Sequence, residues 1–292
     1  MDRLVIFAIV FFASLSFDSF SLGQQTFNVQ IDGPDAIFLA GRTDVRIPPA
    51  SEPWNGPGTR LIRHGSDTPE EALESLPPSV PVEAGDIIRA LDPASGGINF
   101  FLGFGPPFFG PSGNGLSGSN LGSLDGISGY QGPEGPLAGV FLSDAIPDSD
   151  VIPPPTLDFR PGGIGVDFES LEPELGQVFY IGDGVTKTGM FQEFVAPLGA
   201  TRLFLAIPDG FGFDGPPGAY DDNDGSYQIV IAINEIPELL GDLNCDGLID
   251  LLDVQPFVEA ITNSDFINKA DVNQDNFVDL LDVDPFVDLL TN

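Results

Sequence analysis

Residues 242–253 read DLNCDGLIDLLD, and residues 271–282 read DVNQDNFVDLLD. The second segment begins 29 residues after the first and repeats its oxygen-bearing side chains at loop positions 1, 3, 5, 9 and 12. Calcium takes about six to eight oxygen ligands, and a tight loop can supply them only from alternating positions at its start, with a backbone carbonyl at position 7. The repeated spacing therefore predicts two calcium-binding loops.

A helix is expected after each loop. Residues 254–261 and 283–290 carry apolar side chains at helical spacing, and Pro256 and Pro285 fall in the first turn, where a missing N–H is harmless. No comparable helix precedes the first loop, because residues 238–240 are too few. Each unit is thus a loop followed by a helix, and its position 12 is Asp where a standard EF-hand has Glu.

This combination resembles the dockerin domain, a pair of loop–helix calcium repeats at the C-terminus of secreted proteins. The resemblance covers residues 241–292. It implies a small α-helical, EF-hand-like domain that folds only with calcium, since ten clustered oxygen side chains otherwise repel one another. The calcium ligands that it implies, with a backbone carbonyl at position 7, are Asp242, Asn244, Asp246, Leu248, Asp250 and Asp253, then Asp271, Asn273, Asp275, Phe277, Asp279 and Asp282.

The resemblance also implies a partner. Dockerins bind a cohesin domain, and many use hydroxyl side chains at loop positions 10 and 11 for that contact. Those positions here are Leu251, Leu252, Leu280 and Leu281. The expected partner is therefore a cohesin-like or another docking protein. The leucines either pack the two repeats together, which we favour, or present an apolar docking face.

Upstream of the repeats, short apolar or alternating runs recur between turn residues, in a chain with 36 Gly, 28 Pro and 25 Phe. Runs of this length, rich in Val, Ile and Phe, are typical of strands. Strands are expected at residues 27–31, 36–40, 60–63, 86–91, 98–102, 137–142, 177–181, 190–195, 202–207 and 227–233. We expect a mainly β chain, with a jelly-roll-like β-sandwich over residues 24–236. The Gly- and Ser-rich insertion at 103–136 is either an ordered or a mobile loop.

One part of this β domain carries a second pattern. Residues 190–233 contain FQEFVAP, then RLFLAIPDG, then PGAYDDNDGSY before a final strand. They resemble the C-terminal half of the PA-I galactophilic lectin family, a galactose-binding-like β-sandwich whose calcium ion holds sugar hydroxyls. The resemblance implies Asp209, Asp222 and Asn223 as side-chain ligands and Ala219 as a carbonyl ligand. Because residues 211–216 separate Asp209 from the loop, sugar binding, a structural calcium and a metal-free turn all stay open.

The net charge and the N-terminal sequence restrict the partners and the cellular location that we expect for the protein. The chain has 44 acidic and 10 basic residues, a formal charge of −34, which repels phosphate backbones and anionic lipid, so we expect no nucleic-acid partner. The apolar run at 4–13 follows Arg3 and is shorter than the roughly 20 residues that span a bilayer. Residues 1–23 are therefore predicted to be a signal peptide, and the protein to be secreted, extracellular or at the cell surface, with no membrane span.

These expectations combine into one hypothesis, a noncatalytic, lectin-like carbohydrate-binding protein with calcium as its cofactor, acting in polysaccharide binding or catabolism. One alternative is a glycoside hydrolase, which needs two carboxylates about 5–10 Å apart. No motif marks such a pair, and His64 is the only imidazole available to a serine triad. Another alternative is a structural cell-surface protein. Cys245 is the only cysteine, so no intrachain disulfide forms.

Overall fold

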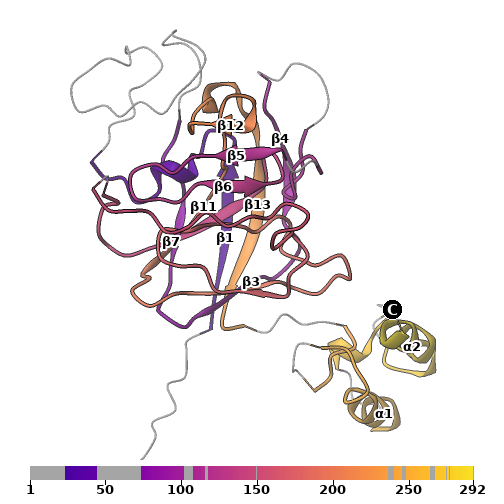
Figure 1. Ribbon diagram of the computed structural model, residues 1–292. Coiled ribbons are helices and arrows are strands. Elements are labelled where there is room, and N and C mark those ends of the chain that lie inside the picture. The colour runs from indigo at the N-terminus through magenta and orange to yellow at the C-terminus, as the bar shows by residue number, and fades with distance from the viewer. Residues whose placement is uncertain are drawn as a thin grey trace, which may run out of the picture.

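The computed structural model describes residues 24–44, 74–101, 108–115, 118–148, 150–235, 240–244, 248–263, 267–273, 275 and 277–291. In these ranges the chain is mainly β, with several sheets and two short α-helices near the C-terminus, α1 (Val254–Asn263) and α2 (Val283–Thr291) (Figure 1). The predicted signal segment, the strand expected at 60–63 and His64 lie outside them. Neither described α-helix has the length and apolar character needed to cross a membrane.

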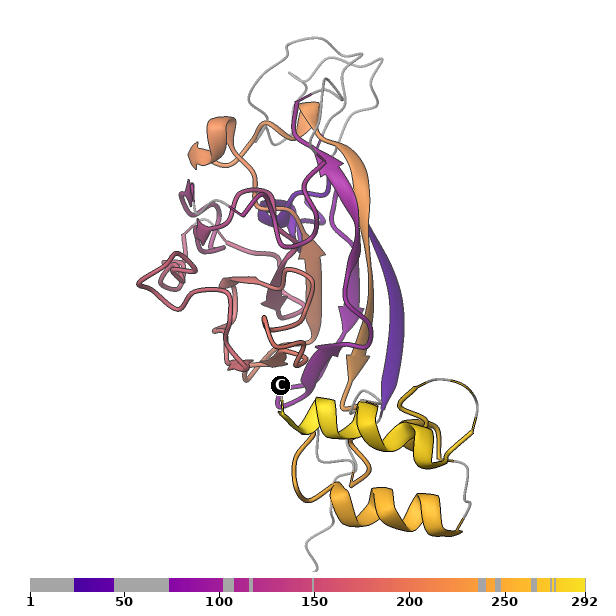
Figure 2. The same ribbon diagram turned by 90° about the vertical axis from the view of Figure 1, so that its right-hand side faces the viewer.

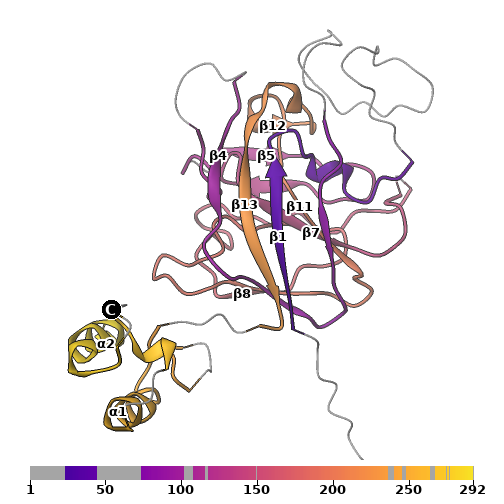
Figure 3. The same ribbon diagram turned by 180° about the vertical axis from the view of Figure 1, so that it is seen from behind.

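The largest sheet has six strands and is organised around its longest strand, β13. Its members are β1 (Gln25–Asp32), β13 (Asp224–Ile233), β3 (Ile87–Ala90), β10 (Glu193–Val195), β8 (Ser170–Leu171) and β4 (Ser95–Asn99). The antiparallel partner β1 follows β13 from the pair Gln25–Ile233 to the pair Asp32–Ser226. On its other side β13 pairs first with β4 and then with β3. Figure 3 shows β1, β13 and β4 side by side.

Two smaller sheets complete the β part. The first orders β2 (Ser79–Pro81), β11 (Arg202–Ala206), β7 (Ala138–Leu142) and β9 (Val178–Tyr180), all antiparallel. The second joins β12 (Asp214–Gly215), β5 (Ser119–Leu121) and β6 (Tyr130–Gly132). Strands β5 and β6 belong to the Gly- and Ser-rich insertion, whose described part therefore forms paired strands. Short 3-10 helices connect the strands at η1 (Ile37–Leu39), η2 (Phe211–Phe213) and η3 (Tyr220–Asp222), and two more, η4 (Asn268–Ala270) and η5 (Leu280–Asp282), lie near α1 and α2.

The six-stranded and four-stranded sheets share one core. In the side view of Figure 2 the large sheet forms one layer, and the remaining strands of the β part lie on one side of it. Ile31 and Ile231 from the large sheet and Leu203 from the second are each at most 1% exposed and belong to the same cluster. Phe179 of β9 meets Phe194 of β10 with 5.2 Å between ring centroids, so aromatic packing also links the two sheets. This core leaves the alternate side chains of β1, at Asn28 and Gln30, exposed on the outer face.

Most of the expected strands are confirmed in position. Those at 27–31, 86–91, 137–142, 177–181, 202–207 and 227–233 overlap observed strands closely, whereas those at 98–102 and 190–195 overlap only in part. The strand expected at 36–40 is wrong, because this fully buried run forms η1, with Leu39 N donating to Ala36 O at 2.9 Å. An unbroken apolar run has no period of its own, so it suits a buried turn as well as a strand.

The C-terminal helices match the expectation for residues 254–261 and 283–290. Pro256 and Pro285 each stand third in their helix, where the missing N–H breaks no helical hydrogen bond. Phe257 and Phe286 form a small core with two alanines. Their rings stack with 3.9 Å between centroids and 16° between planes, which joins the two repeats through equivalent side chains.

Candidate functional sites

Both C-terminal loops are closed by the carboxylate at position 12. Asp253 accepts hydrogen bonds from the backbone N–H groups of Leu243, Asn244 and Asp250 at 2.7 to 2.9 Å. In the second loop, Asp282 accepts from Asn273 N at 3.0 Å and from Asp279 N at 2.9 Å. The two carboxylates thus bond to positions 3 and 9 of their own loops in the same way.

The same correspondence holds at position 9. Asp250 Oδ1 accepts from Leu252 N, and Asp279 Oδ1 accepts from Leu281 N, both at 2.7 Å. Around η5 the second loop also forms a capping box. The side chain of Asp279 accepts a hydrogen bond from the backbone N–H of Asp282, and the side chain of Asp282 accepts one from the backbone N–H of Asp279. These side-chain hydrogen bonds hold positions 9 to 12 of the two loops in equivalent turns.

The predicted ligands differ in burial. Asp242, Asp253 and Asp282 are fully buried and Asp271 is 4% exposed, whereas Asp275 and Phe277 are exposed. Asp246, an implied ligand of the first loop, lies outside the described residues together with Cys245 and Gly247, as do residues 274 and 276 of the second. In the part of the chain that the structure describes, no three His, Cys, Asp or Glu side chains are grouped as metal ligands.

The donor chemistry of the loops nevertheless suits a hard cation. Every implied side-chain ligand is a carboxylate or amide oxygen, the type that calcium prefers. Burying an ionised carboxylate is costly unless a cation or hydrogen bonds compensate it. Between residues 240 and 292 the sequence has twelve acidic side chains and one basic side chain, Lys269.

Lys269 connects the two repeats. Its Nζ lies 3.6 Å from Oδ2 of Asp242, at position 1 of the first loop. Its backbone carbonyl accepts from Gly241 N at 2.8 Å. The equivalent position of the first repeat, 29 residues earlier, is Leu240, so the second loop has no matching lysine.

The four leucines at loop positions 10 and 11 are exposed. Leu251 and Leu252 are 81% and 66% accessible, and Leu280 and Leu281 are 77% and 68% accessible. The expectation that they pack the repeats together is wrong, because Phe257 and Phe286 fill that role. The turns fixed by Asp250 and Asp279 leave both leucine pairs on the surface.

In the β domain the structure brings Asp209 and Asn223 together. Asn223 Nδ2 donates to Oδ2 of Asp209 and to the carbonyl of Gly33, both at 3.0 Å. The two side chains are only 3% and 5% exposed, and Asn223 Oδ1 is a buried atom with no hydrogen-bond partner in the described structure. Ala219 has a left-handed backbone (φ 66°) at the start of η3, and Asp222 ends that turn half-exposed.

Glu74, which the sequence did not single out, belongs to the same buried region. Burial raises the pKa of the Tyr220 hydroxyl well above its usual range, and the nearby carboxylates of Asp209 and Glu74 raise it further. That hydroxyl donates to Ile207 O at 2.8 Å and accepts from Asp209 N at 3.1 Å. Glu74 is fully buried, so the Tyr220 hydroxyl lies near two buried carboxylates inside the β domain.

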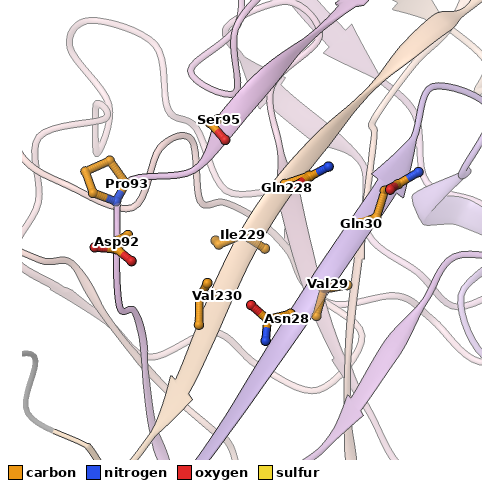
Figure 4. Close-up of a pocket in the computed structure, with 9 residues that line it drawn as sticks. All are labelled: Asn28, Val29, Gln30, Asp92, Pro93, Ser95, Gln228, Ile229 and Val230. Carbon is orange, nitrogen blue, oxygen red and sulfur yellow. The ribbon is translucent and has the colours of Figure 1, made fainter.

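A different feature is open to solvent. A hollow of about 390 Å³ lies on the outer face of the large sheet, over β1 and β13 and beside the chain that leads into β4 (Figure 4). Strand pairing sets Gln30 opposite Gln228, and Gln228 opposite Ser95. The lining includes the polar side chains of Asn28, Gln30, Asp92, Ser95 and Gln228, together with the ring of Pro93. The sequence pattern did not reveal this hollow, because outward polar residues on alternate positions are normal on any exposed strand.

Comparison with protein-family models, with curated proteins and with solved structures finds no match to the chain.

Proposed function

We propose that this chain is a secreted calcium-binding protein in which a dockerin-type, EF-hand-like C-terminal module attaches a noncatalytic carbohydrate-binding β-sandwich to a partner. The observation that carries the proposal is the matched closure of the two loops. Asp253 and Asp282 are both fully buried and bond to the same two positions of their loops. Matched, buried carboxylates at the last position of both loops are what a repeated calcium-binding loop would require.

Calcium is the cofactor that these loops favour. In addition to the buried position-12 carboxylates, Asp242 and Asp271 bury a second carboxylate in each loop at position 1. The single lysine of the module cannot balance twelve acidic side chains. A bound divalent cation would offset this charge, and its binding free energy would then add to the stability of the module.

A calcium titration tests this proposal. By calorimetry, the purified protein should bind two calcium ions per chain, and Asp282→Asn should remove one of them. The substitution keeps the size of the side chain but removes its charge and replaces one acceptor oxygen with a donor. Asp284→Asn is the matched control, because Asp284 is exposed two residues away. Absence of calcium uptake by the unaltered protein would refute the proposal.

The exposed leucines support attachment to another folded protein. Each repeat presents one leucine pair, so the module carries two equivalent apolar patches on a strongly acidic surface. A cohesin-like or other docking domain with an apolar patch inside a basic rim would complement both features. Salt would then slow association with this partner, while Leu→Ser substitutions would speed dissociation.

For the β domain we propose carbohydrate recognition in polysaccharide binding or breakdown. The polar hollow on the outer face of the six-stranded sheet supports this role. Retention on a glycan array tests for binding, and release of reducing sugar from the same polysaccharides distinguishes a glycoside hydrolase from a binding module. Sugar release would replace the proposal with the enzyme, and absence of both would leave the structural cell-surface role.

A further inference from the structure

We infer that the hollow on the outer face of β1, β13 and β4 is the ligand site of the β domain, and that its ligand is a neutral oligosaccharide. This inference rests on the proposed carbohydrate function and gives that function a site. It places the site away from Asp209 and Asn223, the residues that the lectin resemblance implies. Those two side chains are 3% and 5% exposed and are hydrogen-bonded to each other, so they belong to the interior of the β domain.

The side chains of the hollow match the hydroxyl groups of a sugar. Gln30, Gln228 and Ser95 lie opposite one another on three adjacent strands. The backbones of neighbouring strands are about 4.8 Å apart. Asn28 stands on β1 one outward position from Gln30 and opposite Val230. Amide and hydroxyl side chains both donate and accept hydrogen bonds, as sugar hydroxyls do.

The amides of the hollow are available to a ligand. Asn28 and Gln228 are exposed, and within the described residues their side chains make no hydrogen bond. Gln30 Nε2 donates to Asp32 Oδ1 at 2.7 Å, which orients this amide. In Figure 4 the amides of Gln30 and Gln228 extend from adjacent strands along the same face.

The charge of the hollow selects a neutral ligand. Asp92 is the only ionisable side chain among the nine residues that line it, although the protein as a whole carries a formal charge of −34. That overall charge repels uronates and sulfated sugars. A single carboxylate can accept hydrogen bonds from a pair of neutral hydroxyls at the edge of the site.

The position of the hollow follows from the pairing of β13 with its neighbouring strands. The strand that pairs with β13 changes from β4 to β3 at Asp92 and Pro93, and Leu91 N donates to Val230 O at 2.8 Å. Pro93 has no N–H to give to the ladder. Ala94 N donates instead to Asp183 O at 2.8 Å, away from β13. The interruption leaves one side of β13 uncovered, and the proline ring adds an apolar wall for a sugar face.

The test is a binding measurement on a panel of neutral cello-, xylo-, manno- and galacto-oligosaccharides. The unaltered protein should bind at least one of them, and the double variant Asn28→Ala with Gln228→Ala should bind it at least tenfold more weakly. Gln25→Ala is the matched control, because it removes an exposed amide of β1 outside the hollow. Gln228→Glu keeps the side-chain size and adds a charge, so it should also weaken binding if the double variant fails to fold.

The outcomes separate this inference from the function beneath it. Binding that survives both the double variant and Gln228→Glu would overturn the hollow and leave carbohydrate recognition in place. Stronger retention of sulfated or uronate oligosaccharides than of the neutral panel would overturn the neutral ligand. No retention of any glycan by the unaltered protein would overturn the proposed recognition and the inference together.

Discussion

The rings of Phe257 and Phe286 stack 3.9 Å apart between centroids, and each phenylalanine occupies the same position of its repeat. The contact joins equivalent side chains of the two loop–helix units. Among the described residues of the module, the small core has only four buried hydrophobic residues, so the two rings, which bury about 150–250 Å² each, contribute much of its buried area. Each helix therefore packs its buried phenylalanine against the other repeat.

Truncation of this stack should unfold the C-terminal module before the β domain. Phe286→Ala removes a side chain that is 2% exposed, and such changes cost about 3–5 kcal/mol. The helical circular dichroism of the protein should fall and its calcium affinity should weaken. Val287→Ala is the control, because Val287 is 48% exposed on the same helix, lies outside the loop and should change neither. Equal effects of the two variants would contradict a core role for the stack.

The exposed leucines should contribute little to stability. Replacing Leu251, Leu252, Leu280 and Leu281 with serine should change the free energy of unfolding by less than about 0.5 kcal/mol per site, as for other surface positions. Urea denaturation in calcium checks this value. A loss of several kcal/mol would show that these side chains are buried in the protein in solution.

The two loops that we propose to bind calcium should differ in their affinity for it because of Lys269. Its ammonium group lies 3.6 Å from the carboxylate of Asp242 and opposes a second positive charge in the first loop. Lys269→Gln should therefore raise the affinity of the weaker site about tenfold, or about 1.4 kcal/mol. Calorimetry of the unaltered protein should resolve two unequal sites that converge in the variant. The control Lys187→Gln removes a lysine that is 78% exposed, and a similar gain there would point to general charge repulsion.

The bond between Asn223 and Asp209 should stabilise the β domain without taking part in ligand binding. Asn223→Ala leaves Asp209 Oδ2 and the carbonyl of Gly33 without this donor, at a cost of about 1–3 kcal/mol. Chemical denaturation measures the cost, and Asn120→Ala, which removes an exposed amide, should cost less than about 0.5 kcal/mol. Retained affinity for glycans in Asn223→Ala would agree with an internal role, and complete loss in a folded variant would contradict it.

Acid titration should reveal the pair formed by Asp158 and Arg160. The side chain of Arg160 is the main cause that lowers the pKa of Asp158 from 3.8 to about 2, and the backbone N–H of Arg160 adds to this effect. Because the folded pKa is lowered, the stability from this pair is present above pH 3.8 and is lost as the pH falls through about 2. In Arg160→Gln the pKa of Asp158, followed by NMR, should return toward 3.8. An unchanged titration would exclude Arg160 as the cause.

The sequence predicts the long elements of this fold better than the short ones. Periodic runs such as those in β1, β13, α1 and α2 are found at their expected positions because burial of one face imposes a period. Strands β2, β5, β6, β8 and β12 contain only two or three residues each and escape that reasoning. Their pairing depends on distant partners, as with Asp214 beside Asn120, and no local pattern marks such a contact.

The candidate sites divide in a similar way. Equal spacing predicts the equivalence of Asp253 and Asp282, because a repeated loop must repeat its contacts. Spacing does not predict that Lys269 reaches Asp242, since this ion pair joins different repeats. The hollow over Gln228 depends on the point at which β4 gives way to β3, which is set by the packing of the whole sheet.

Strand β13 has a mechanical consequence. It is held on both sides by β1, β3 and β4, it carries Gln228 in the hollow, and its last residue, Ile233, precedes the C-terminal module by only a few residues of chain. Tension between a ligand gripped at the hollow and a partner gripping the tail would pass along this one covalent strand. The β1 edge would be loaded in shear, with all eight of its pairings sharing the pull at once. Such a load would be carried by a strand whose inward side chains Tyr227, Ile229 and Ile231 also anchor it in the hydrophobic core.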